Sequence, residues 1–201
     1  GGGGGGRGGG GGGGGRGGGG GGGGRGVRNI DALADAGHDV LVPDMPGFGD
    51  SAAPPDGQDA DVLHGWLERG LAQLVGDRPV AVVGFSFGGL VAGLWARAVP
   101  QRVARLVLVG APALSAERLA PLDLRPWERQ PPGAGRLAVH RHNLLQLMLA
   151  HEASATPLAV ALHAANVERD RLRRRRLMLT DALAQLLPQL ACPVHGIWGA
   201  Q

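Results

Sequence analysis

Beyond residue 26, apolar and polar residues follow two alternating patterns along the chain. Short, continuous apolar runs rich in β-branched residues predict buried strands at residues 38–44, 78–84, 104–112 and 192–201. Longer segments with apolar residues at every third or fourth position predict helices at residues 27–37, 61–76 and 87–100. Strands that are apolar throughout and alternate with helices indicate a parallel sheet covered on both faces. The predicted fold class is therefore α/β, a three-layer sandwich around a mostly parallel sheet.

A second region, residues 112–190, departs from this alternation. It begins with a proline-rich stretch and continues with two segments of helical spacing, residues 136–152 and 156–188. Thr156-Pro157 has the pattern of a helix start, a capping residue followed by a first-position proline. The region is too long for a simple crossover between strands. We expect it to form a helical cap inserted into a core made by residues 27–111 and 191–201.

The N-terminal tract, residues 1–26, contains only glycine apart from Arg7, Arg16 and Arg25. It has no side chains to bury and the largest backbone entropy to lose, so it is predicted to be disordered. Its Arg-Gly-Gly pattern leaves open a second function, an RNA-binding tail on a non-catalytic domain. Such tails combine basic charge with stacking groups, and this tract has no aromatic residue.

Composition narrows the classes of partner. The net charge is only +3, and all 20 basic residues are arginines, so the pI near 10.7 does not by itself indicate nucleic-acid binding. Cys192 is the single cysteine, which excludes an internal disulfide and a cysteine-based metal site. We expect no cofactor and no metal. No apolar run is long enough to span a bilayer and no signal peptide is visible, so the expected location is cytoplasmic.

One short motif carries candidate chemistry: Gly84-Phe85-Ser86-Phe87-Gly88. Because a predicted strand precedes Ser86 and a predicted helix follows it, the motif has the layout of a nucleophile elbow. Small residues are needed two positions before and two positions after the serine, where strand and helix approach, and Gly84 and Gly88 meet that need. Gly89 further eases the start of the helix. The helix N-terminus would place partial positive charge, including the Phe87 N–H, where an oxyanion forms. The alternative is an ordinary glycine-rich turn between strand and helix. A phosphate-binding form of it is disfavoured, because the G-x-G-x-x-G spacing and a phosphate-loop lysine are both missing.

Four segments together resemble the α/β-hydrolase family: residues 37–51, 84–89, 105–114 and 192–201. The resemblance implies that Ser86 is the catalytic nucleophile of a serine hydrolase acting on a small acyl or ester substrate. Residues 28–51 favour the subgroup that cleaves carbon–carbon bonds in ring-fission products, whereas Phe85 departs from that subgroup. Esterase and carbon–carbon hydrolase both stay open.

Other parts of the family pattern are not visible in this sequence. The family's His-Gly oxyanion loop would precede residue 27, where the glycine tract lies. Its acid would follow Gln201, with its histidine later still. The resemblance therefore implies a fragment, and the chain as given is expected to be inactive.

The remaining polar candidates have less specific patterns. None of the seven histidines is expected to act as base for Ser86, although His140 and His142 are candidates for lining a substrate pocket. Asp44 and Asp50 flank a Pro-Gly-Phe-Gly turn, where a hydrogen-bonding role is favoured over that of a displaced catalytic acid. The Arg173–Arg176 run lies in a helical pattern with acidic neighbours, which indicates a solvated helix face.

Overall fold

The computed structural model describes residues 23–57, 59–115, 122–172 and 174–199. Its strands are β1 (Val80–Phe85), β2 (Val103–Val109) and β3 (Val194–Ile197). Its α-helices are α1 (Gly23–Asp35), α2 (Ala60–Val75), α3 (Phe87–Ala98), α4 (Ala134–Leu147), α5 (Pro157–Glu168) and α6 (Ala182–Leu186). Short 3₁₀ turns occur at Pro100–Arg102, Trp127–Arg129, Glu152–Ser154, Leu177–Leu179 and Leu187–Gln189. Within these described residues, no helix is long and apolar enough to cross a membrane.

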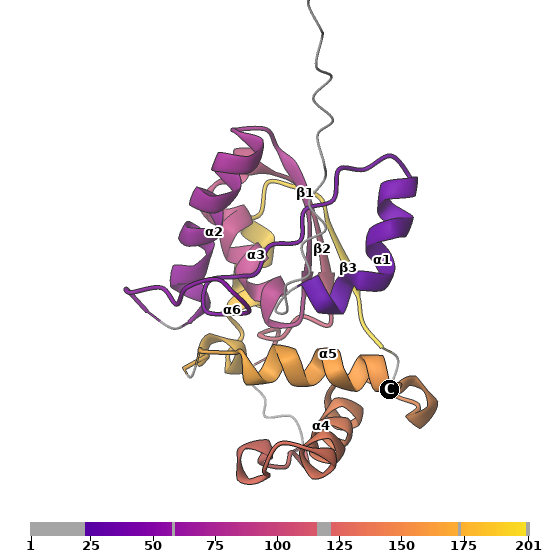
Figure 1. The fold of residues 1–201 in the computed structure, drawn as a ribbon. Helices are drawn as coiled ribbons and strands as arrows, with labels where there is room; N and C mark the ends of the chain where they lie inside the picture. Colours follow the sequence, from indigo (N-terminus) through magenta and orange to yellow (C-terminus); the bar gives the residue numbers. More distant parts are fainter. Residues whose placement is uncertain (1–22, 58, 116–121, 173, 200–201) are drawn as a thin grey trace, which may run out of the picture.

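The three strands form one parallel sheet in the order β1-β2-β3, which confirms the predicted α/β class. Gly84 lies opposite Leu108, and Leu106 lies opposite Val194. Helices α2, α3 and α6 lie on one side of the sheet and α1 on the other, while α4 and α5 lie beyond one end of it (Figure 1). Helix α1 begins at Gly23, within the tract predicted to be disordered, and residues 1–22 lie outside the described residues.

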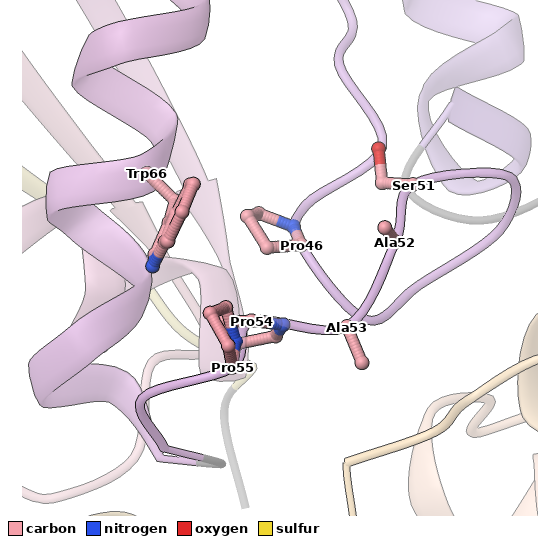
Figure 2. Close-up of a pocket in the computed structure, with 7 residues that line it drawn as sticks. All are labelled: Pro46, Ser51, Ala52, Ala53, Pro54, Pro55 and Trp66. Atoms are coloured by element: carbon pink, nitrogen blue, oxygen red, sulfur yellow. The ribbon is translucent and has the colours of Figure 1, made fainter.

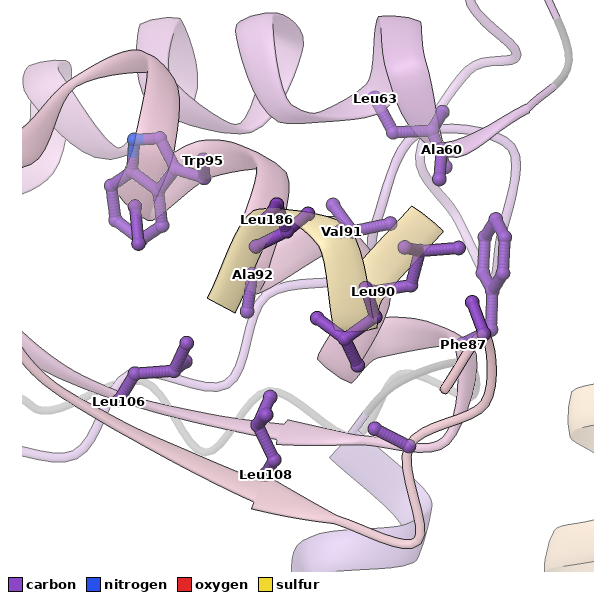
Figure 3. Packing of buried hydrophobic residues seen from close by; sticks show 14 of the residues in the cluster. Ala60, Leu63, Phe87, Leu90, Val91, Ala92, Trp95, Leu106, Leu108 and Leu186 are labelled. Carbon is purple, nitrogen blue, oxygen red and sulfur yellow. The ribbon is translucent and has the colours of Figure 1, made fainter. Parts of the chain in front are cut away.

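The hydrophobic core lies between the sheet and helix α3. Leu90 and Leu106 are fully buried, and Trp95 and Leu108 are 1% exposed (Figure 3). Burying an aliphatic side chain of this size contributes about 1.5–3 kcal/mol. Helix α6 packs onto the same core, where Leu183 would lie only 2.8 Å from a Cβ at Gly93. The predicted cap thus has its last helix against α3; the domain boundaries themselves stay a prediction.

A polar cluster joins helix α2 to this core. Glu68 on α2 accepts hydrogen bonds from Trp95 Nε1 at 2.6 Å and from Arg102 Nε at 2.8 Å. Arg102 is 2% exposed and also donates to the carbonyl of Arg78 at 2.7 Å. A buried guanidinium is tolerated only when it is paired and hydrogen-bonded, so Glu68 fixes the position of α2 against the start of β2.

The predicted strand at residues 38–44 is wrong, because the structure has no strand there. Leu41 and Val42 are 47% and 41% exposed instead of buried. A strand needs a partner for its backbone N–H and C=O groups, and β1 pairs only with β2 in the described part of the chain. The Ser86 N–H donates to the Val109 carbonyl, and in a parallel pair only every second residue bonds to the neighbouring strand. The backbone N–H and C=O of Val83 therefore point away from β2, toward the unpaired edge of β1.

The predicted helix at residues 156–188 is also broken. Helix α5 ends at Glu168, and residues 174–176 are not helical, so the prediction of an arginine-rich helix face is wrong. The backbone there bonds to other parts of the molecule: the Arg171 N–H donates to Gly47, and the Arg176 N–H donates to the carboxylate of Asp59. These tertiary partners replace the hydrogen bonds that a continued helix would have made.

Candidate active site

Ser86 occupies the turn between β1 and α3 with an unusual backbone. Its φ of 51° and ψ of −126° lie outside the regions that residues with a Cβ prefer. Such a conformation costs about 1–3 kcal/mol and persists only where the surroundings enforce it. The Ser86 N–H donates to Val109 at 2.8 Å, and its carbonyl accepts from the Gly89 N–H at 2.8 Å. Sheet and helix therefore hold the turn from both sides.

The close approach of strand and helix falls on two glycines. A Cβ at Gly84 would lie 2.6 Å from Gly89 Cα and 2.8 Å from the Gly88 carbonyl oxygen. At Gly89, a Cβ would lie 2.6 Å from Ala111 Cβ. At Gly88 it would meet only Met45 Cε, at an ordinary 3.9 Å. Packing thus excludes larger residues at Gly84 and Gly89. The expectation that the close approach requires a small residue at Gly88 is wrong, because a Cβ there has room.

The N-terminus of α3 supplies positive potential beside Ser86. Because α3 begins at Phe87, the Phe87 N–H is among the first-turn donors that no helix carbonyl can satisfy. The serine side chain does not cap these donors. The Phe87 ring is 5% exposed and packs against Phe48, with 6.2 Å between ring centroids. The Arg175 guanidinium lies 5.3 Å from the centre of the Phe87 ring.

The turn at residues 44–51 carries both aspartates singled out in the sequence. Asp44 Oδ2 accepts the Asp50 N–H at 3.1 Å, and the Asp44 carbonyl accepts the Ser51 hydroxyl at 2.7 Å. Asp50 forms an ion pair with Arg169. The favoured interpretation of Asp44 as a hydrogen-bonding residue of the turn is confirmed.

The histidines do not assemble with Ser86. No hydrogen bond joins Ser86 Oγ to any of the seven, all of which lie among the described residues. His140 is completely buried and lies 3.0 Å from Glu168, so the expectation that it lines a substrate pocket is wrong. His142 lies 2.7 Å from the Asp123 carbonyl. Across the described part of the chain, no group of three His, Cys, Asp or Glu residues could hold a metal ion.

Two hollows lie near the turn at residues 44–51, on the side that faces helix α2. The first, of about 370 Å³, is lined mostly by proline, alanine and the Trp66 ring (Figure 2). The second, of about 430 Å³, is lined by charged residues as well, among them Asp59, Arg174 and Arg176. Neither hollow includes Ser86, so the candidate nucleophile lies outside both.

Sequence reasoning missed the residues that surround the elbow from a distance in the chain. Phe48, in the turn at residues 44–51, and Arg175, in the arginine run, both contact the Phe87 ring. Both are distant from Phe87 in the sequence. Only the Pro-Gly-Phe-Gly turn had a signal, since it belongs to a segment with family resemblance. Nothing local in the sequence singled out Arg175 from the other arginines of its run.

Several known proteins share stretches of this sequence. It is 32% identical over 97 residues to 2-hydroxy-6-oxo-6-phenylhexa-2,4-dienoate hydrolase of Comamonas testosteroni, a match over 48% of this chain and 34% of that protein. It is 41% identical over 78 residues to 2-hydroxymuconate semialdehyde hydrolase of Pseudomonas putida, a match over 38% of this chain and 27% of that protein. The matched stretches thus span about a third of the length of these curated relatives.

Solved structures and a family model give the wider fold. A probable hydrolytic enzyme of Pseudomonas aeruginosa superposes with a TM-score of 0.62 and 24% identity, over 87% of this chain and 60% of that one. A meta-cleavage product hydrolase of Pseudomonas fluorescens superposes with a TM-score of 0.53 and 20% identity, over 85% and 75%. The model of the alpha/beta hydrolase fold matches residues 15–184. This chain therefore belongs to the alpha/beta hydrolase fold family.

Proposed function

We propose that Ser86 is the nucleophile of a serine hydrolase and that the Phe87 N–H is one donor of its oxyanion hole. The observation that carries this proposal is the strained backbone of Ser86 between a parallel strand and a helix N-terminus. Strain of this kind at a non-glycine residue is typical of functional sites. Ser86 is half-buried, and its hydroxyl belongs to the residue just before α3, where the dipole of that helix favours negative charge.

The chemistry follows from the positions of the two groups. Ser86 Oγ attacks the electrophilic carbon of an acyl group, and the carbonyl oxygen gains negative charge as the bond forms. The first-turn N–H groups of α3 stabilise that charge; removing one such donor typically costs about 10²–10³ in rate. The serine proton must pass to a base, because a neutral hydroxyl is a weak nucleophile near neutral pH.

For the substrate, we propose a 2-hydroxy-6-oxo-dienoate or a related ring-fission product, cleaved at a carbon–carbon bond. The relatives named above support this choice, since both are hydrolases of compounds of that kind. Simple esters are the alternative. Parallel assays distinguish them, because cleavage of a dienoate removes its long-wavelength absorbance whereas p-nitrophenyl acetate releases a coloured phenolate.

For the chain as it stands, we propose turnover close to background. No histidine among the described residues hydrogen-bonds to Ser86, and general-base assistance contributes about 10²–10⁴ in rate. The chain and its Ser86→Ala variant should hydrolyse p-nitrophenyl acetate at equal, near-background rates. A clear Ser86-dependent burst would show that a base does act on the serine.

The nucleophile itself is tested by the selectivity of covalent labelling. At high pH, where hydroxide can remove the proton that no positioned base takes, a fluorophosphonate probe should label Ser86 faster than Ser154, which lies on a surface 3₁₀ turn. Peptide mapping by mass spectrometry locates the label, and Ser154 provides the control within each sample. Even labelling of the two serines would contradict the proposed role of Ser86.

A further inference from the structure

A short segment after α5 docks on the turn that precedes the elbow. This strap, residues 169–172, runs beside residues 47–51, with which it shares backbone and side-chain contacts. The Arg171 N–H donates to the Gly47 carbonyl at 3.0 Å. Leu172 is 2% exposed and packs on the same glycine, where a Cβ would lie 2.6 Å from Leu172 Cδ2. One buried apolar side chain and one backbone bond therefore seat the strap.

The Arg171 side chain clamps the turn itself. Its Nη1 donates to the Gly49 carbonyl at 2.9 Å, and its Nη2 donates to the carbonyls of Phe48, at 3.5 Å, and Ser51. Three turn carbonyls thus share one guanidinium, whose planar fork of donors is suited to such a geometry. A charged donor strengthens each of these hydrogen bonds.

The clamped turn contacts the elbow through the aromatic rings of Phe48 and Phe87. Phe48 belongs to the clamped turn, and its ring lies 6.2 Å from that of Phe87, tilted by 43°. Arg175 lies over both rings, 5.6 Å from the centre of Phe48 and 5.3 Å from that of Phe87. Phe87 is the residue directly after Ser86, so movement of its ring would displace the first turn of α3.

We propose that Arg171 is a positioning residue for the elbow: by clamping the turn at residues 48–51, it holds Phe48 against Phe87 and so fixes the first turn of α3. The inference deepens the proposed function, because the Phe87 N–H is the oxyanion donor proposed above. Arg171 acts through the turn and Phe48 and does not touch the substrate. Its neighbour Arg174 makes no hydrogen bond or ion pair with any described residue and offers a matched comparison.

Hydrogen exchange separates the turn from the elbow. The Gly47 N–H, bonded to Ala52 at 2.9 Å, and the Ser51 N–H, bonded to Phe48 at 3.0 Å, report on the turn. The Gly89 N–H, bonded to Ser86 at 2.8 Å, reports on the elbow. In Arg171→Met, exchange at all three amides should rise about tenfold. Arg171→Lys should restore part of the protection, and Arg174→Met should leave all three amides unchanged.

Two outcomes would overturn the proposal. In the first, Arg171→Met releases the turn amides while Gly89 exchanges as before. The second concerns Phe48→Leu, which keeps the Arg171 clamp but removes the aromatic ring. The turn amides should stay protected while the Gly89 amide exchanges faster. An unchanged exchange rate at Gly89 would contradict the coupling through Phe48, even if Arg171→Met does not fold. The readout is structural, so it succeeds or fails independently of whether Ser86 reacts with the labelling probe.

Discussion

Replacing Gly89 by alanine would insert a methyl group into one of the two closest contacts around the Ser86 turn. The new Cβ would lie 2.6 Å from Ala111 Cβ, 3.2 Å from the Gly84 carbonyl oxygen and 3.4 Å from Leu108 Cδ2. Relieving such overpacking typically costs about 1–3 kcal/mol. Alanine in a helix is favoured over glycine by about 0.5–1 kcal/mol, which offsets part of that cost. We therefore expect Gly89→Ala to lower the free energy of unfolding by about 1–2 kcal/mol.

Gly88→Ala provides the matched control in the same helical turn. Its Cβ would meet only Met45 Cε at 3.9 Å, so the helix preference acts without a clash and stability should rise by about 0.5–1 kcal/mol. The two variants should thus differ by about 2 kcal/mol, or roughly 4–8 °C in Tm for a domain of this size. Urea unfolding followed by tryptophan fluorescence measures the difference, provided that the m-values agree. Equal stability of the two variants would refute the assignment of the close approach to Gly89.

Three further predictions concern stability and association. Glu68→Leu should lower the free energy of unfolding by about 3–5 kcal/mol, because it leaves the buried Arg102 guanidinium without its carboxylate; the double variant with Arg102→Leu should recover much of that loss in the same denaturation assay. Thr156→Ala should lower the free energy of unfolding by about 1 kcal/mol through loss of the α5 cap to Ala159, with Thr156→Ser unaffected. The purified chain should self-associate through the uncharged edge of β1, and Val83→Lys, at a side chain that is 63% exposed, should shift light-scattering masses toward monomer; an unchanged mass distribution would exclude this edge.

The parts of the fold that the sequence predicts well are those with local causes. Strands β1, β2 and β3 form at three of the predicted apolar runs and pair as a parallel sheet. The predicted burial is wrong for β3, whose four residues are all exposed. Helix α5 begins where Thr156 and Pro157 indicate, with the Thr156 hydroxyl accepting the Ala159 N–H. The strand-turn-helix layout around Ser86 is local too, because it depends on residues within one strand, one turn and one helix start.

The errors arise where distant partners decide the conformation. Residues 38–44 have the composition of a strand, but a strand forms only beside another strand, and its pattern does not say whether that partner exists. Residues 169–176 continue a helical spacing, but Gly47 and Asp59 take the hydrogen bonds that a helix would need. The contact between Phe48 and Phe87 could not be predicted for the same reason, since it joins two segments by tertiary packing.

The docking of the strap has a consequence for the timing of synthesis. Arg169 pairs with Asp50, which lies 119 positions earlier in the chain. At about 5–20 residues per second, a ribosome needs about 6–24 s to add that length of chain. β1, Ser86 and α3 are made within this interval. The turn at residues 47–51 still lacks Arg169 and Arg171, which bond to it in the folded chain. We therefore expect the elbow of a nascent chain to be open to proteases and chaperones until the strap leaves the ribosome.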